Sequence, residues 1–171
     1  PAETLPFRNG AFDLITAGLA FHWFDQTAFL REAHRVLEED GRLVIFHSGF
    51  TGRMSENERF SRWAKGPYHE RFPKPARRAA GVSAPFAESH VFELAGRESF
   101  GHVERMSVGQ LAAYLATQSN VIARVENGTT TIDEALGWIE REAAPFFEGE
   151  AAGSFEFTAD LWHLRHRRPP A

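Results

Sequence analysis

Two apolar runs separated by one amphipathic segment, between residues 12 and 46, constrain the fold of this chain most strongly. Phe12 to Ala17 has the pattern of a short buried strand, and Leu43 to Phe46 is a continuous apolar run without alternation. An apolar run of this kind is typical of a parallel strand that is covered on both faces. Two parallel strands joined by a helix form a right-handed βαβ unit. The sequence therefore predicts an α/β fold.

The helix between the two strands is predicted from its cap and its periodicity. The Asp25 carboxylate can accept hydrogen bonds from backbone N–H groups two or three residues further on. Gly41 stands where a helix C-terminus favours a left-handed residue, so we expect the helix to end just before it. The apolar face recurs at intervals of three and four residues and comprises Phe29, Leu30, Ala33, Val36 and Leu37.

Composition excludes several classes of protein. The chain has 171 residues, of which 43% are hydrophobic and 25% charged, so we expect a soluble globular protein with one domain, or one domain with a small appendage. It has no cysteine, which excludes thiol catalysis and disulfides and suits a cytoplasmic location. The net charge of -4 offers no general attraction for nucleic acid, and no apolar window is long enough for a membrane helix. We expect neither nucleic acid nor membrane as a partner.

The order of the later segments completes the predicted fold. Residues 48–87 are rich in glycine and proline and too long for a plain connection, so they are predicted to be a helical and irregular lid insertion with one helix over Glu56 to Lys65. A strand is expected at Val91 to Leu94 or at Phe100 to Val103. Two amphipathic helices follow, one capped by Ser107 and one after the threonine run 129–131. The alternating pattern 155–164 predicts a closing, half-exposed antiparallel strand.

Other chemistries receive no support from the residues. His163 and His166 are three apart on a predicted strand, which points the two rings to opposite faces, so no metal site is expected. The serines have no Gly-x-Ser-x-Gly context, and no phosphate-binding Gly-x-x-x-x-Gly-Lys loop occurs.

Three motifs in the first 50 residues carry a family resemblance. They are Leu-Pro-Phe at 5–7 followed by Phe-Asp at 12–13, Phe-His-Trp-Phe-Asp at 21–25, and Glu-Ala-x-Arg-Val-Leu-x-x-x-Gly at 32–41. Together they resemble class I S-adenosylmethionine-dependent methyltransferases of the type 11-like branch. The resemblance implies the C-terminal half of a Rossmann-like methyltransferase sheet, mostly parallel with a final antiparallel strand. It divides the chain into a partial core (1–47 and 88–168), the lid (48–87) and a tail (169–171).

The resemblance also implies which residues face the cofactor, S-adenosyl-L-methionine. The first segment resembles the loop that reads the adenine ring, and the carboxyl end of the first strand is where open α/β sheets place ligands. Phe21-His22-Trp23 resembles the family segment that covers the methionine part of the cofactor. The implied cofactor-binding residues are Ala2, Glu3, Leu5, Thr16, Ala17, Gly18, Leu19 and Trp23.

His22 is the implied catalytic residue, since an imidazole can accept a proton near neutral pH without a large pKa shift. A fixed structural hydrogen bond at the helix entry is the alternative role for this histidine. The implied wall of the acceptor pocket includes arginines that would favour a carboxylate-bearing small molecule. Its residues are Phe21, Arg53, Tyr68, Arg71 and Arg77.

The departures from the family pattern set further expectations. The glycine-rich cofactor turn and the acidic ribose-binding residue of this family have no counterpart in these residues. We therefore expect the chain to begin mid-domain, to bind S-adenosylmethionine very weakly and to be inactive alone. The 12–17 strand would be left as an apolar edge that favours aggregation or pairing with a second copy. The alternative function is a non-catalytic, methyltransferase-like binding or interaction module.

Overall fold

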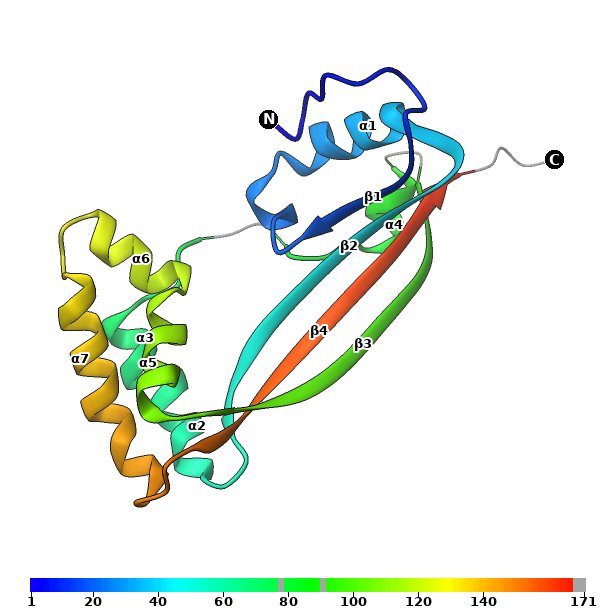
Figure 1. Cartoon of the computed structure of the whole chain (residues 1–171). Helices are drawn as coiled ribbons and strands as arrows, with labels where there is room; N and C mark the ends of the chain where they lie inside the picture. Colours follow the sequence, from blue (N-terminus) through cyan, green and yellow to red (C-terminus); the bar gives the residue numbers. More distant parts are fainter. Residues whose placement is uncertain (77–78, 90–91, 168–171) are drawn as a thin grey trace. The chain divides into compact units, whose positions relative to one another are not determined.

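The computed structural model describes residues 1–76, 79–89 and 92–167, and Figure 1 shows their course. Four strands form one sheet in the order β1-β2-β4-β3. In Figure 1 the arrow of β4 points against that of β1, whereas β1 and β2 pair in parallel. The predicted α/β fold, with a final antiparallel strand, is confirmed. The strands are β1 (Phe12–Gly18), β2 (Leu37–Met54), β3 (Phe92–Met106) and β4 (Gly153–His166).

The βαβ unit forms as predicted at its start and differs at the end of its helix. Helix α1 (Gln26–Val36) begins with the Asp25 carboxylate accepting the Ala28 N–H at 3.0 Å. The predicted continuation to Gly41 is wrong, because Leu37 is extended and pairs with Phe12 of β1. Gly41 lies in β2, where an added Cβ would come within 2.6 Å of the Leu37 side chain. Close approach, and not a left-handed turn, is therefore what requires glycine there.

The chain divides into two compact units. Unit 1 comprises Pro1–Gly49, Arg77–Phe100 and Ala159–Ala171, and unit 2 comprises Phe50–Ala76 and Gly101–Thr158. Strands β2, β3 and β4 each contribute residues to both units. The lid assignment of residues 48–87 stays a prediction, while in the structure residues 50–76 pack in unit 2 together with residues 101–158.

Unit 1 has a core built from the inner faces of α1 and the sheet. It also holds the short 3₁₀ helix η1 (Phe21–Trp23) and helix α4 (Ala84–Glu88). Within the sheet of the described residues, β1 lies at one edge, as expected from the sequence. Pairing of that edge with a second copy stays a prediction. The largest fully buried side chains of this core are Phe21, Leu30, Leu43, Ile45, Phe92 and Leu164.

Unit 2 is mainly helical, and two of its helices are capped by side chains at most three residues away. Helices α5 (Val108–Ala116) and α7 (Ile132–Ala143) begin with capping boxes at Ser107 and Thr131. The cap at Ser107 and a helix after the threonine run are as predicted from the sequence. The remaining elements are α2 (Glu58–Lys65), α3 (Pro67–Arg71), α6 (Ser119–Glu126) and η2 (Ala144–Phe147).

The predicted strand after residue 90 is a single longer element. Strand β3 runs through both candidate positions, although Val91 itself lies outside the described residues. Helix α6 was not predicted from the sequence. None of the helices in the described part of the chain combines the length and apolarity needed to cross a membrane.

Candidate functional site at the end of strand β1

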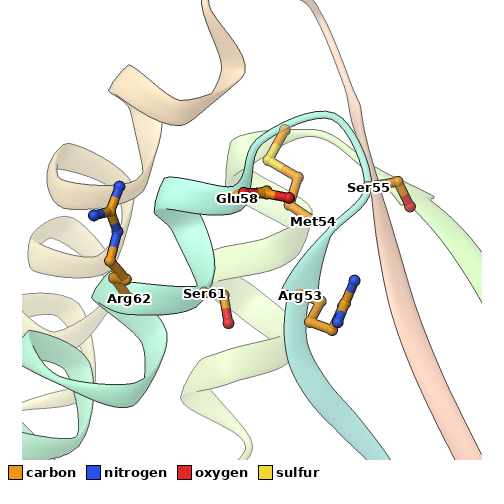
Figure 2. A pocket seen from close by; sticks show the side chains of 6 residues that line it. All are labelled: Arg53, Met54, Ser55, Glu58, Ser61 and Arg62. Carbon is orange, nitrogen blue, oxygen red and sulfur yellow. The ribbon is translucent and has the colours of Figure 1, made fainter.

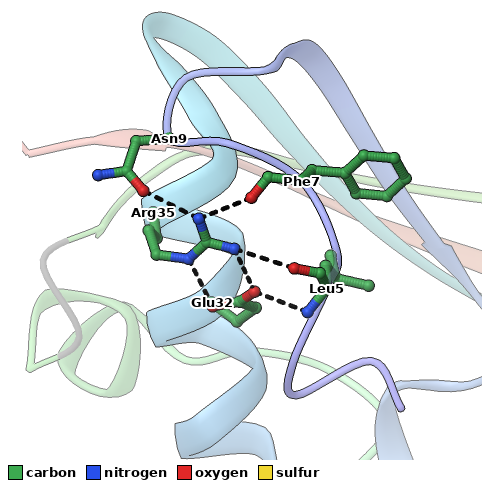
Figure 3. A network of polar contacts seen from close by, with 5 residues as sticks. All are labelled: Leu5, Phe7, Asn9, Glu32 and Arg35. Atoms are coloured by element: carbon green, nitrogen blue, oxygen red, sulfur yellow. Dashed lines mark hydrogen bonds and ion pairs between the residues drawn. The ribbon is translucent and has the colours of Figure 1, made fainter.

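The segment before β1 is held against α1 by hydrogen bonds to an ion pair on that helix (Figure 3). The Glu32 carboxylate binds Arg35 at 2.6 Å and accepts the backbone N–H of Leu5 at 2.7 Å. Arg35 also donates to the carbonyl oxygens of Leu5 and Phe7 and to the side chain of Asn9. The hydrogen bond from Arg35, followed by that from Leu5, lowers the pKa of Glu32 to about 2. Leu5, a predicted cofactor-binding residue, is thus positioned through its backbone.

Ala2 and Glu3, the other two N-terminal residues predicted for cofactor binding, also contact other parts of unit 1. Glu3 Oε1 accepts the backbone N–H of Asp25 at 2.9 Å, next to the start of α1. Ala2 packs against the core of this unit. Glu3 therefore lies at the start of α1, and Ala2 lies on the core of unit 1.

The carboxyl end of β1 brings a small residue and a strained residue together. Gly18 faces the Phe46 ring so closely that an added Cβ would lie 2.2 Å from the ring. Leu19 adopts φ 54°, a left-handed conformation, and donates its N–H to the Phe46 carbonyl oxygen at 3.0 Å. Ala17 is buried, while Thr16 is exposed on β1. Left-handed backbone at a non-glycine residue is a form of strain that clusters at ligand sites.

Three consecutive residues of η1 have three different environments. Phe21 is 1% exposed and packs edge-on against Phe29 in the core, with ring centroids 5.9 Å apart. His22 is 7% exposed, whereas Trp23 is 59% exposed. Leu19, just before η1, is also half exposed. The segment thus offers one buried imidazole flanked along the chain by two exposed apolar side chains.

His22 lies beside a second histidine that the sequence did not single out. The ring centroids of His22 and His47 are 5.7 Å apart, with the rings nearly perpendicular. His47 stands on β2, next to β4 in the sheet. On β4, Asp160 accepts hydrogen bonds from Ser99 and, at 3.1 Å, from Arg97. The Ser99 hydrogen bond lowers the pKa of Asp160 most, and Arg97 and the charge of His47 lower it further.

The predicted acceptor residues of unit 2 have separate surroundings. Tyr68 is 3% exposed and its hydroxyl donates to the Leu115 carbonyl oxygen at 3.3 Å, while burial raises its pKa to about 12. The Arg71 guanidinium lies 5.0 Å from the centre of the Trp138 ring. Arg77 lies outside the described residues. The structure therefore places Tyr68 in packing and Arg71 on an aromatic face.

Arg53 is the predicted acceptor residue that lines a cavity (Figure 2). The cavity has a volume of about 510 Å³ and is formed by the end of β2 and by α2. Nε of Arg53 is ion-paired with Glu156 at 3.0 Å. The other lining residues are Met54, Ser55, Glu58, Ser61 and Arg62.

Comparison with known proteins finds similarities in sequence and in fold. Residues 1–45 match the family model described as the methyltransferase domain. The structure of a predicted type II methyltransferase from Anaeromyxobacter dehalogenans aligns over 99% of this chain and 71% of its own, with a TM-score of 0.64 and 20% identity. The fold is therefore similar to that of this methyltransferase structure, and the sequence match to the methyltransferase domain covers residues 1–45.

The methyltransferase relatives in sequence are longer than the part they share with this chain. A predicted methyltransferase of Dictyostelium discoideum is 25% identical over 77% of this chain, and the match spans 51% of its own length. A ubiquinone/menaquinone biosynthesis C-methyltransferase of Geotalea uraniireducens is 41% identical over 26% of this chain and 20% of its own length. The chain thus spans about half, or less, of these relatives.

In this chain, the motif and the tertiary structure contribute different residues to the candidate site. The motif pointed to His22 and Trp23, and the position at the carboxyl end of the predicted strand pointed to Leu19. All three residues follow β1 directly in the chain. His47 and Asp160 were missed, because no local pattern links residues on β2 and β4. Only the strand order of the folded sheet, in which β2 and β4 are neighbours, brings these strands together. The ligand roles of all the predicted residues stay predictions.

Proposed function

We propose that this chain takes part in the transfer of a methyl group from S-adenosylmethionine to a small-molecule acceptor. The observation that carries the proposal is the buried His22 imidazole in η1, directly after the carboxyl end of β1, within the segment that matches the methyltransferase domain. In open α/β sheets, ligands bind at the carboxyl ends of the strands.

The residues at this end of β1 suit S-adenosylmethionine. Leu19 and Trp23 are large apolar side chains that are 50% and 59% exposed, so a ligand that covered them would remove apolar surface from water. An indole face also attracts a cation such as a sulfonium. Glu3, Ala2 and the anchored backbone of Leu5 would face the adenosine part. When bound, S-adenosylmethionine supplies a methyl group activated by a positively charged sulfur.

His22 would serve as the proton acceptor for the nucleophile. Histidine is the side chain suited to act as a general base near neutral pH. Because the side chain is 7% exposed, we propose a small acceptor that can reach it. Preference for a carboxylate-bearing acceptor and a cytoplasmic location belong to this proposal as well.

The first test is calorimetric titration of S-adenosylhomocysteine into the chain and into a version extended upstream through the adjoining coding sequence. We expect binding by the extended version and weaker binding by the chain alone. Trp23→Ala should weaken binding about tenfold, which corresponds to about 1.4 kcal/mol. Phe100→Ala, which removes another exposed aromatic side chain of unit 1, is the matched control and should leave the affinity unchanged.

Transfer of a labelled methyl group to a panel of small acceptors, with and without a carboxylate, tests the reaction itself. His22→Asn should lower the rate constant while retaining S-adenosylhomocysteine binding. Absence of binding by both the chain and its extended version would overturn the enzymatic proposal and favour a methyltransferase-like interaction module.

A further inference from the structure

Asp160 is held in place from β3 by two donors of different kinds. The Ser99 hydroxyl and Nη2 of Arg97 both bind Oδ1 of Asp160, the latter at 3.1 Å. The Asp160 side chain is 29% exposed, so solvent screens it only in part. A carboxylate that accepts charge-assisted hydrogen bonds is stabilised in its ionised form. Asp160 therefore presents a fixed negative charge on this part of β4.

His47 lies within the electrostatic reach of that carboxylate. Its strand, β2, is the neighbour of β4 in the sheet, and its charge contributes to lowering the pKa of Asp160. The influence is reciprocal, because an attraction that favours the carboxylate equally favours the imidazolium. If one histidine of this region carries a positive charge, His47 is the one that Asp160 stabilises.

His22 is the ring neighbour of His47. With ring centroids 5.7 Å apart, a positive charge on one imidazole opposes a second positive charge on the other. The nearly perpendicular arrangement directs an edge of one ring toward the face of the other. Of the neighbouring charged groups, Glu98 and His163 pair with each other at 2.9 Å, and strand alternation puts them on the opposite face from Asp160.

We propose that Asp160 and His47 are positioning residues that keep His22 uncharged and ready to accept a proton. His47, stabilised by Asp160, takes the positive charge that would otherwise compete for His22. The inference rests on the proposed function in one respect, namely that His22 is the base. It deepens that function by assigning a device, built from β2, β3 and β4, that tunes the base.

In the proposed methyl transfer, the proton and the electron pairs are accounted for as follows. The acceptor group X–H gives its proton to the unprotonated nitrogen of His22, and the electron pair left on X forms the bond to the methyl carbon. The electron pair of the broken carbon–sulfur bond stays on sulfur. An already protonated His22 would have no lone pair for that proton, which is why its neutrality matters.

The test measures the titration midpoints of the His22 and His47 imidazoles by NMR in the chain without ligand. The variants His22→Gln and His47→Gln assign the two imidazole signals. In Asp160→Asn the titration midpoint of His47 should fall and that of His22 should rise. At 5.7 Å a unit charge in water shifts a titration by about 0.5 pH unit, so the rise at His22 should reach about that size. His47→Gln should produce the same rise at His22.

Two further variants guard against a general loss of structure. Asp160→Glu retains the charge and should restore the midpoints toward those of the unmodified chain. Asp13→Asn removes an exposed carboxylate five residues before Gly18 on β1 and should leave both midpoints unchanged. Circular dichroism melts establish which variants are folded.

The result distinguishes this inference from the proposed function. Unchanged His22 midpoints in folded Asp160→Asn and His47→Gln would overturn the inference even if the chain binds S-adenosylhomocysteine. Shifted midpoints of the expected signs support the coupled histidines, and binding of S-adenosylhomocysteine is then judged by its own titration.

Discussion

The guanidinium of Arg35 and the carboxylate of Glu32, one turn apart on α1, meet at 2.6 Å and together bind the backbone before β1 (Figure 3). An ion pair between residues three apart is common on helix surfaces and contributes little there. This one differs, because Glu32 and Arg35 also satisfy backbone groups of Leu5 and Phe7. The pair therefore links the helix to a segment with predicted cofactor-binding residues.

Glu32→Gln should loosen that segment and change the acid stability of the chain. The pKa of Glu32 in the folded chain is about 2, below its ordinary value of 4.5. Its contribution to stability is therefore present above about pH 4.5 and is lost as the pH falls toward 2. Between pH 4.5 and pH 2 the melting temperature of the variant should fall less steeply than that of the unmodified chain. Amide exchange at Leu5 should be faster in the variant. Glu38→Gln, an exposed change on β2, is the control, and equal slopes in both variants would contradict the prediction.

Gly18→Ala should destabilise unit 1, because its new Cβ would lie 2.2 Å from the Phe46 ring. Overpacking of this kind costs about 1–3 kcal/mol. Urea unfolding measures the loss, and the double variant Gly18→Ala/Phe46→Ala should recover part of it. Gly96→Ala is the matched strand control, since its nearest neighbour would be 4.0 Å away, at His163. A neutral Gly18→Ala would show that the ring moves aside freely.

Leu19→Gly should separate backbone strain from ligand binding. A left-handed conformation costs a non-glycine residue about 1–2 kcal/mol, and the greater freedom of glycine in the unfolded chain offsets about 0.5–1 kcal/mol. We expect a free energy of unfolding that is unchanged or up to about 1.5 kcal/mol higher. Affinity for S-adenosylhomocysteine should fall. Leu14→Gly, a similarly exposed leucine within β1, should lose stability, and an equal loss in both variants would argue against strain at Leu19.

Tyr68 should behave as a packing residue. Burial raises its pKa to about 12, so the neutral hydroxyl stabilises the fold below about pH 10 and this contribution is lost as the pH rises toward 12. The chain has two tyrosines, and burial raises the pKa of Tyr114 as well. Tyrosinate absorbance should therefore develop late in an alkaline titration, unless unfolding precedes it.

Tyr68→Phe removes the hydrogen bond to Leu115 and should cost about 1 kcal/mol in urea unfolding. The Michaelis constant for the acceptor should stay the same in this variant. A large rise in that constant with unchanged stability would instead support the predicted acceptor contact, and Tyr114→Phe provides the comparison.

Local signals in the sequence were sufficient for the starts of α1, α5 and α7, and not for that of α6. Asp25, Ser107 and Thr131 each cap a helix through groups at most three residues away, so the sequence alone specifies these contacts. The end of α1 could not be predicted in the same way. Leu37 fits both the apolar face of a helix and a buried strand, and its pairing with Phe12 decides between them.

The candidate site shows the same division. The Phe-His-Trp motif made His22 a candidate from the sequence, because a motif is a property of adjacent residues. His47, Ser99 and Asp160 come from three strands and are neighbours only through the strand order β2-β4-β3. The sequence by itself determined the α/β class, the helix caps and the candidate base. The tertiary structure decided which charges surround that base, since electrostatic interaction depends on distance in space and not on separation along the chain.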